Sequence, residues 1–174
     1  MMSDIIIRDA KVEDTQEMAI VRQNVWATTY RGIYNDEIID DFDYEKAAHS
    51  FMEKIERPTT MFKVAVCDKK IVGYVCFGES KYKYKDYPYI INYLHILKNY
   101  QGKGLGRLFF NKIMEYVKQN HIDKFYVSCN KYNYPACQYY EKVGGIVDYV
   151  DEVKENKKDE QVIYTYSVGG LNND

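Results

Sequence analysis

A glycine-rich turn is the clearest chemical feature of the sequence. In NYQGKGLGRLFFNKIMEYV, the glycines Gly102, Gly104 and Gly106 alternate with larger residues. Lys103 lies between the first two glycines, Arg107 follows the third, and an apolar helical pattern comes directly after. The first N–H groups of a helix lack partners within the helix and carry the positive end of its dipole. Glycines let these N–H groups approach an anion closely, and the two cations add charge. The pattern predicts a binding turn for a pyrophosphate.

The spacing separates this turn from other phosphate-binding loops. The P-loop requires G-x-x-x-x-G-K-[ST] and the dinucleotide fingerprint requires G-x-G-x-x-G, and neither occurs here. The pattern that does occur is Q-x-x-G-x-G, met by Gln101, Gly104 and Gly106. Three glycines preceded by this glutamine and flanked by cations favour an anion site over a plain helix entry.

Composition limits the classes of protein to consider. The 174 residues carry a formal net charge of −2 and are 46% apolar, which is ordinary for a globular protein. Nothing in this balance favours nucleic acid or an anionic membrane, and no apolar run approaches the roughly 20 residues of a membrane span. The N-terminal residues do not resemble a signal peptide, so a cytoplasmic protein is expected.

Four cysteines are scattered without metal-ligand spacing. Cys67, Cys76, Cys129 and Cys137 form no C-x-x-C pair and have no histidine at a ligating distance along the chain. Three of them lie in apolar surroundings, which indicates buried reduced thiols. No metal site is predicted.

Hydrophobic periodicity predicts seven strands with helices between them. Strands are expected at residues 4–10, 61–68, 70–80, 89–97, 124–129, 145–153 and 161–168. Helices are expected after a cap at Asp14, over residues 35–55, after the glycine turn, and from Pro135 to the pair Gly144–Gly145. This order predicts one mixed α/β domain over residues 1–174, with a core from about 4 to 168 and a loose tail at 169–174.

A second motif lies downstream of the turn. NKYNYPACQYYEKVGG, residues 130–145, fits N-x-x-N-x-x-A-x-x-x-Y-E-K-x-G. With the glycine turn, it makes the chain resemble the GNAT superfamily of acyl-CoA-dependent N-acetyltransferases over nearly its whole length. Residues 5–14 and 26–37 are similar to that family's opening strand and first helix-to-helix loop. The resemblance implies a mostly antiparallel central sheet of about seven strands, about four flanking helices, and a splay between the fourth and fifth strands.

The same resemblance implies acetyl-CoA as co-substrate, with no metal. The turn from Gln101 through Arg107, including Leu105, would hold the pyrophosphate with its backbone amides. A main-chain N–H around His95 and Ile96 would face the acetyl carbonyl, and Asn133 would bond the pantetheine arm. The chain is then expected to transfer an acetyl group directly to a primary amine.

Tyr140 is the expected general acid, because a phenol stays protonated at neutral pH and could protonate the leaving thiolate. Without the resemblance, a core aromatic would be the better interpretation of Tyr140. The sequence does not identify the general base. Some members of the family carry Glu where this chain has Ile90, and the remaining candidates here are Glu79 and His95. A histidine in an apolar strand is more often a core residue than a base.

The acceptor cannot be identified by motif. Trp26, Tyr30 and Asn92 are expected near an acceptor pocket, although Trp26 and Tyr30 could equally be helix core. Acidic residues between 36 and 43 favour a cationic acceptor such as a polyamine, and a small amine is preferred over a protein N-terminus. The alternating stretch at residues 81–89 fits the end of a hairpin better than a basic-aromatic surface.

Two other functional classes remain as alternatives. A coenzyme-binding sensor without catalysis would bind acetyl-CoA and turn over no amine. A nucleotide-phosphate site would let ATP compete with acetyl-CoA at comparable affinity. No nucleic-acid or membrane partner is expected, and a homodimer through the C-terminal strands is common in the family but not indicated by any residue here.

Overall fold

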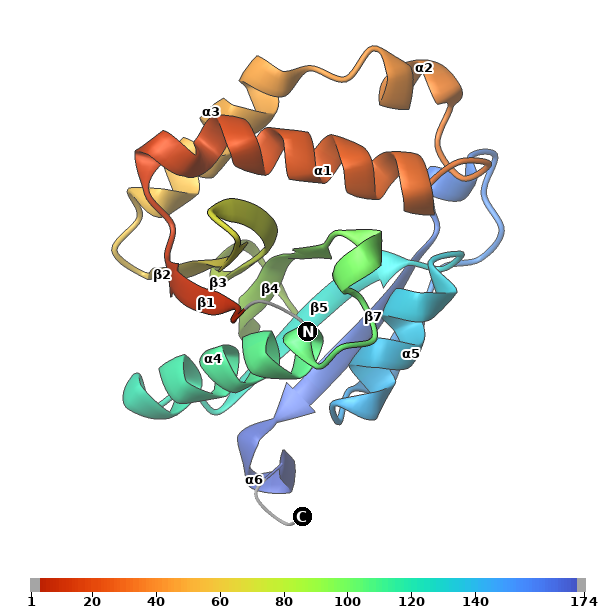
Figure 1. The fold of residues 1–174 in the computed structure, drawn as a ribbon. Helices are drawn as coiled ribbons and strands as arrows, with labels where there is room; N and C mark the ends of the chain where they lie inside the picture. The colour runs from red at the N-terminus through yellow and green to blue at the C-terminus, as the bar shows by residue number, and fades with distance from the viewer. Residues whose placement is uncertain (1–3, 172–174) are drawn as a thin grey trace.

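The computed structural model describes residues 4–171, arranged as one twisted sheet with helices on both faces (Figure 1). The seven strands are β1 (Ile6–Asp9), β2 (Thr60–Cys67), β3 (Lys70–Tyr84), β4 (Tyr87–Ile96), β5 (Lys124–Asn130), β6 (Ile146–Val150) and β7 (Gln161–Ser167). The helices are α1 (Thr15–Thr29), α2 (Asp36–Asp40), α3 (Tyr44–Ile55), α4 (Leu105–Gln119), α5 (Tyr134–Lys142) and α6 (Val168–Leu171), with short 3₁₀ turns at Val12–Asp14, Lys98–Tyr100 and Lys157–Asp159.

The sheet has the order β1-β2-β3-β4-β5-β7-β6. All neighbours are antiparallel except β4 and β5, which are parallel. The expected mixed sheet of seven strands is therefore confirmed. One parallel pair in the middle follows from the crossover through α4, which carries the chain across one face of the sheet.

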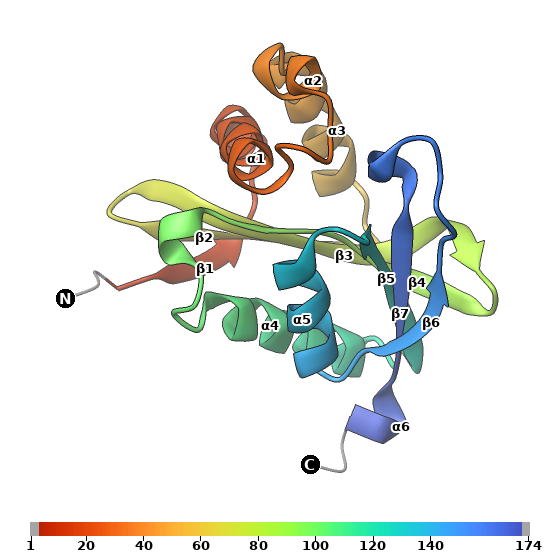
Figure 2. The same cartoon turned by 90° about the vertical axis from the view of Figure 1, so that its right-hand side faces the viewer.

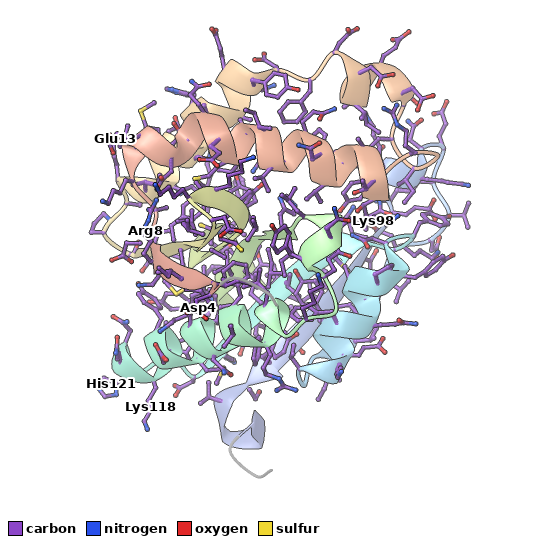
Figure 3. All side chains as sticks on the ribbon, viewed as in Figure 1. Asp4, Arg8, Glu13, Lys98, Lys118 and His121 are labelled. Atoms are coloured by element: carbon purple, nitrogen blue, oxygen red, sulfur yellow. The ribbon has the colours of Figure 1, made fainter. Side chains whose placement is uncertain are left out.

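Helices α1 to α3 cover one face of the sheet and α4 and α5 cover the other (Figure 2). Each layer has its own apolar core. Phe51 of α3 and Met18 of α1 are fully buried on the first face, and Phe109 and Ile113 of α4 on the second. Side chains fill the space on both sides of the sheet (Figure 3). Lys98, labelled there, lies in the 3₁₀ turn that leads from β4 towards α4.

The helical region expected over residues 35–55 consists of two helices, α2 and α3. The side chain of Asp43 accepts a hydrogen bond from the N–H of Lys46 at 2.9 Å and so starts α3 afresh. Such a cap satisfies a helix N–H that has no partner within the helix. An apolar pattern that spans two helices conceals a break of this kind.

Asp14 precedes α1 as expected, but its carboxylate does not cap that helix. It accepts from the Arg8 guanidinium at 2.7 and 2.9 Å and from the N–H of Lys11 at 2.8 Å. The guanidinium lowers the pKa of this carboxyl group. Asp14 therefore ties β1 to the turn before α1.

Other boundaries differ by a few residues. β3 continues to Tyr84, which pairs with Tyr87 of β4. The stretch at 81–89 is therefore the end of a long hairpin, which is the interpretation that the sequence favoured. The first three residues of the expected tail, 169–171, belong to the short helix α6, which begins at Val168. Residues 172–174 lie outside the described part. Within residues 4–171, no helix combines the length and apolar character that crossing a bilayer requires.

Candidate active site

The two central strands separate at the middle of the sheet. β4 and β5 pair only at Tyr89 with Phe125 and at Ile90 with Tyr126. Beyond Ile90, the edge of β4 has no partner strand, and a cavity of about 440 Å³ opens between the strands. The expected splay is thus confirmed, and its volume is in the range of small-molecule sites.

A bulge in β4 adjoins this cavity. Tyr93 is opposite Cys76 and Ile91 is opposite Phe77, so Asn92 is an extra residue that also lines the cavity. Bulges redirect side chains and interrupt pairing. As a result, Ile91 belongs to the core under α4, whereas Tyr93 packs on the α1 side.

The cavity passes through the sheet from one helical layer to the other. Gln101, Gly102, Gly106 and Tyr140 line it on the α4 and α5 side. On the α1 side it is lined by Val25, Thr29, Tyr30 and Tyr34. A molecule bound in it could therefore be approached by a second molecule from the opposite face.

The glycine turn presents a row of unused N–H groups beside the cavity. Gly102 and Gly104 have φ of 71° and 89°, a left-handed conformation that costs glycine little. Among the described residues, the N–H groups from Gly102 to Arg107 donate to no backbone carbonyl, and no side chain caps α4. A Cβ added at Gly102 or Gly104 would meet no atom within 4 Å, so this surface is open. Converging free amides of this kind form an anion-binding nest.

The side chains of the turn have different positions. Lys103 and Arg107 are exposed beside it without lining the cavity, and the Lys103 Nζ lies 5.8 Å from the Tyr100 ring centroid. Leu105 is buried in the core, so only its backbone faces the turn. Gln101 donates from its side-chain amide to the carbonyl oxygen of Ile96 at 2.9 Å, which joins the turn to the end of β4.

The β4 edge carries an unpaired N–H at Ile96. The N–H of Leu97 donates to the carbonyl of Val72 in β3. Because successive N–H groups of a strand point to opposite sides, the N–H of Ile96 faces the gap towards β5. This N–H is therefore open to a hydrogen-bond acceptor in the gap.

Tyr140 lines the cavity near the turn and is 6% exposed. Burial raises the pKa of its phenol well above the ordinary value, and neighbouring tyrosines raise it further. The phenol is therefore protonated at any physiological pH. Its chemistry in the cavity would be that of a proton donor.

Asn133 uses both amide functions inside the protein. Its Oδ1 accepts from the N–H of Ala136 at 3.3 Å and caps α5, and its Nδ2 donates to the hydroxyl of Tyr30 at 3.2 Å. Burial raises the pKa of Tyr30 to about 12. Asn133 therefore links the end of α1 to the start of α5 across the cavity, a role that the sequence did not indicate.

Most of the predicted site residues meet at the cavity, but not all. Those that line it are Tyr30, Asn92, His95, Ile96, Gln101, Gly102, Gly106, Asn133 and Tyr140. Those that do not are Trp26, Lys103, Gly104, Leu105 and Arg107. Trp26 instead packs edge-on against Tyr34, with ring centroids 5.3 Å apart, and supports that lining residue from behind.

Several lining residues were not predicted. Tyr139 is the most informative, because its hydroxyl donates to the carbonyl oxygen of Gly106 at 2.7 Å. Tyr34, Ser128 and Cys129 also line the cavity. Tyr139 could have been suspected from its place beside Tyr140, whereas the others have no local sequence signal.

No carboxylate of the described residues lines the cavity. Of the two candidate bases, Glu79 is exposed and lies elsewhere, and His95 lines the cavity but binds Tyr74 through Nδ1 at 2.5 Å. Burial, together with the charge of Arg22, lowers the pKa of His95 to about 3. Neither residue is therefore placed to accept a proton near neutral pH.

The acidic loop is also engaged elsewhere. Arg31 forms ion pairs with Asp36 at 3.1 Å and with Asp40 at 2.5 Å, and Asp43 caps α3. None of these carboxylates lines the cavity. The reason for expecting a cationic acceptor is therefore removed.

Within residues 4–171, no three His, Cys, Asp or Glu side chains are grouped so that they could hold a metal ion. None of the four cysteines forms a disulfide within residues 4–171; Cys67, Cys76 and Cys129 are buried and Cys137 is partly buried. Cys129 and Cys137 lie side by side, with their sulfur atoms 3.4 Å apart.

The architecture has close relatives among solved structures. The PaiA N-acetyltransferase from Thermoplasma acidophilum, in complex with coenzyme A, superposes with a TM-score of 0.80 at 21% identity, covering 94% of this chain and 99% of that one. YncA from Salmonella typhimurium, a putative acetyltransferase with its cofactor acetyl-CoA, gives a TM-score of 0.71 at 16% identity, covering 94% of each chain. At these identities the likeness establishes the fold.

Sequence comparison supplies the family. YuaI of Bacillus subtilis (strain 168), an uncharacterized N-acetyltransferase, is 24% identical over 125 residues, which are 71% of this chain and 70% of YuaI. The sequence profile of the Acetyltransferase (GNAT) family matches residues 23–145, which include the glycine turn, both splayed strands and α5. The chain belongs to the GNAT family of acetyltransferases.

Proposed function

We propose that this protein transfers the acetyl group of acetyl-CoA to the primary amine of a small molecule. The observation that carries the proposal is the row of unpartnered N–H groups from Gly102 to Arg107 beside a cavity that passes through the sheet. A pyrophosphate needs such donors. The relatives solved with coenzyme A or acetyl-CoA support this choice of anion.

The cavity fits the rest of such a co-substrate. The unpaired edges of β4 and β5 offer backbone groups to an extended pantetheine arm in the way that an added strand would use them. When bound, the thioester supplies an activated acetyl group. The N–H of Ile96, which faces the gap, is positioned to donate to negative charge that develops on an acyl oxygen.

Tyr140 is proposed as the general acid. Its phenol is protonated, lines the cavity and lies on the helix that packs against the glycine turn through Tyr139. A proton from its hydroxyl would convert the departing thiolate into a thiol. Residues 4–171 place no carboxylate at the cavity to remove the amine's proton, so the amine must react from its neutral form.

A second candidate rests on this missing base. A coenzyme-binding sensor of the same fold would need the anion turn and the cavity but no proton acceptor. A sensor would not need the hydroxyl of Tyr140 at the cavity, which is why we prefer the enzyme.

Thiol release with acetyl-CoA and a panel of primary amines tests the proposal. We expect turnover on at least one small amine, and weak or no competition by ATP. Submicromolar to micromolar binding of acetyl-CoA without turnover on any amine or peptide N-terminus would favour the sensor. Competition by ATP at an affinity equal to that of acetyl-CoA would favour a nucleotide site instead.

A further inference from the structure

A buried cation lies behind the α1 side of the cavity. The guanidinium carbon of Arg22 lies 4.2 Å from the ring centroid of Phe51 and 4.5 Å from that of Tyr93, and the residue is only 9% exposed. Among the described residues it has no carboxylate partner, and its Nη2 has no hydrogen-bond partner. A buried charge is normally paired, so an unpaired guanidinium behind the wall of a cavity calls for a function.

Arg22 also determines the protonation of His95. Its Nε donates to the hydroxyl oxygen of Tyr74 at 3.4 Å, and Tyr74 is fully buried with that hydroxyl 2.5 Å from His95 Nδ1. A guanidinium can only donate, so among the described partners of the Tyr74 hydroxyl, Arg22 and His95, only Nδ1 of His95 can accept its proton. A neutral imidazole that accepts at Nδ1 carries its proton on Nε2. With the hydroxyl proton on this side, His95 would offer the cavity that it lines an Nε2–H donor.

Two cations lie close to the wall around His95. Tyr93 and His95 line the cavity, the Arg22 guanidinium carbon lies 4.5 Å from the Tyr93 ring centroid, and the Nζ of Lys54 lies 5.9 Å from it. The acidic groups that raise the pKa of lining residues are Asp159, which acts on Tyr34, and Glu141, which acts on Cys129. No carboxylate of the described residues lines the cavity to balance these cations.

We propose that the acceptor carries a carboxylate, or a similar anionic oxygen group, close to its amine, and that the Nε2–H of His95 and the charge of Arg22 receive this group. The inference rests on the proposed acetyl transfer and names the substrate class for it. A polyamine would bring a second ammonium group towards two cations, whereas an amino acid would bring a compensating anion. The aromatic lining from Tyr30, Tyr34 and Tyr93 suits an apolar side chain on that amino acid.

The same charge assists the chemistry. An ammonium group beside Arg22 is disfavoured relative to the neutral amine, and only the neutral amine can attack. A positive wall therefore performs part of the task that a carboxylate base performs elsewhere.

Matched acceptors test the proposal. Leucine, leucinamide and 3-methylbutylamine share a side chain and differ in the group beside the amine, and spermidine represents the polyamines. We expect leucine to bind the CoA-saturated protein at least 10-fold more tightly than 3-methylbutylamine in calorimetry, with leucinamide between them and spermidine weakest. The corresponding order is expected for kcat/KM.

Variants of Arg22 and His95 test whether these two residues produce the preference for leucine. Arg22→Met keeps an unbranched side chain between the two rings and removes the charge, and we expect it to reduce the leucine preference at least fivefold, whereas Arg22→Lys retains most of it. His95→Phe removes the donor, and His95→Gln restores one. Unchanged acetyl-CoA affinity and melting temperature identify variants that are folded.

The tautomer of His95 gives a readout that needs neither turnover nor a variant. Only His49, His95 and His121 contribute imidazole signals in ¹⁵N-correlated NMR. We expect one imidazole to remain neutral with its proton on Nε2 from pH 5.5 to 8.

Two results would overturn the proposal: a preference for 3-methylbutylamine or spermidine over leucine, or a His95 that carries its proton on Nδ1. These outcomes differ from a failure of the proposed function, which would appear as no acetylation of any amine. Selective binding of leucine and the tautomer would still be measurable in that case.

Discussion

The hydroxyl of Tyr139 on α5 donates to the carbonyl oxygen of Gly106 in the first turn of α4, at 2.7 Å. Its ring also occupies the space beside that glycine, since a Cβ there would lie 2.9 Å from the ring. The two helices that carry the anion turn and Tyr140 are thus locked together at this point. The contact explains why the third glycine of the motif is required even though its backbone is helical.

Gly106→Ala should therefore weaken acetyl-CoA binding about 10-fold, because the ring of Tyr139 must move and the hydrogen bond is lost. Alanine itself favours a helix by roughly 0.5–1 kcal/mol over glycine, so the fold should survive. Calorimetry on the single variant and on Gly106→Ala with Tyr139→Ala checks this. An equal loss of acetyl-CoA affinity in the single and the double variant would show that the displaced Tyr139 ring does not cause the weaker binding.

Gly104→Ala tests the left-handed backbone of the turn. We expect a loss of about 1 kcal/mol in the free energy of unfolding, from the positive φ, and a larger loss of acetyl-CoA affinity, because a methyl group would stand on the anion surface. Gly32 is a matched control, with φ of 81°, open space around it and no place in the cavity lining. Gly32→Ala should cost similar stability and leave affinity unchanged.

Tyr140→Phe should reduce kcat by roughly 10²–10⁴-fold if proton donation limits the rate. The affinity for acetyl-CoA should change little, since the ring and its packing remain. Steady-state kinetics and calorimetry together make the distinction. Full activity of this variant would assign the proton to water and remove Tyr140 from the mechanism.

The pH dependence of kcat/KM should follow the amine and not the protein. No carboxylate of the described residues lines the cavity, and the pKa of His95 is lowered to about 3, so no side chain there changes from acid to base between pH 6 and 9. We expect log kcat/KM to rise with unit slope until the pKa of the free amine is reached, and to shift when an amine of lower pKa is used. A midpoint near 6.5 that is independent of the amine would reveal a base on the protein.

Cys137 should be the most reactive of the four thiols. The hydrogen bond with Cys129 lowers the pKa of Cys137, and Cys137 is only partly buried. Iodoacetamide labelling followed by mass spectrometry should show Cys137 modified first, with a rate that rises at lower pH than for an ordinary thiol. In Cys129→Ala that rise should move to higher pH, because the donor is gone.

Local sequence determined the elements and the anion turn. The glycines at 102 and 104, with Gln101 before them, encode their own conformation, because a left-handed backbone and a bare helix N-terminus depend on neighbouring residues alone. The alternation in β2 and β3 and the stripe on α4 likewise predicted strands, hairpin and helix. Tyr140 was found through the motif that contains it.

Only the tertiary structure decided how the site is charged. Arg22, Tyr74 and His95 come from α1, β3 and β4, and no pattern along the chain links residues so far apart. The acidic residues between 36 and 43 attracted attention in the sequence, yet Arg31 and the start of α3 use most of them. Spacing along the chain fixes backbone geometry, but which charges meet and which are left unpaired depends on packing between distant segments.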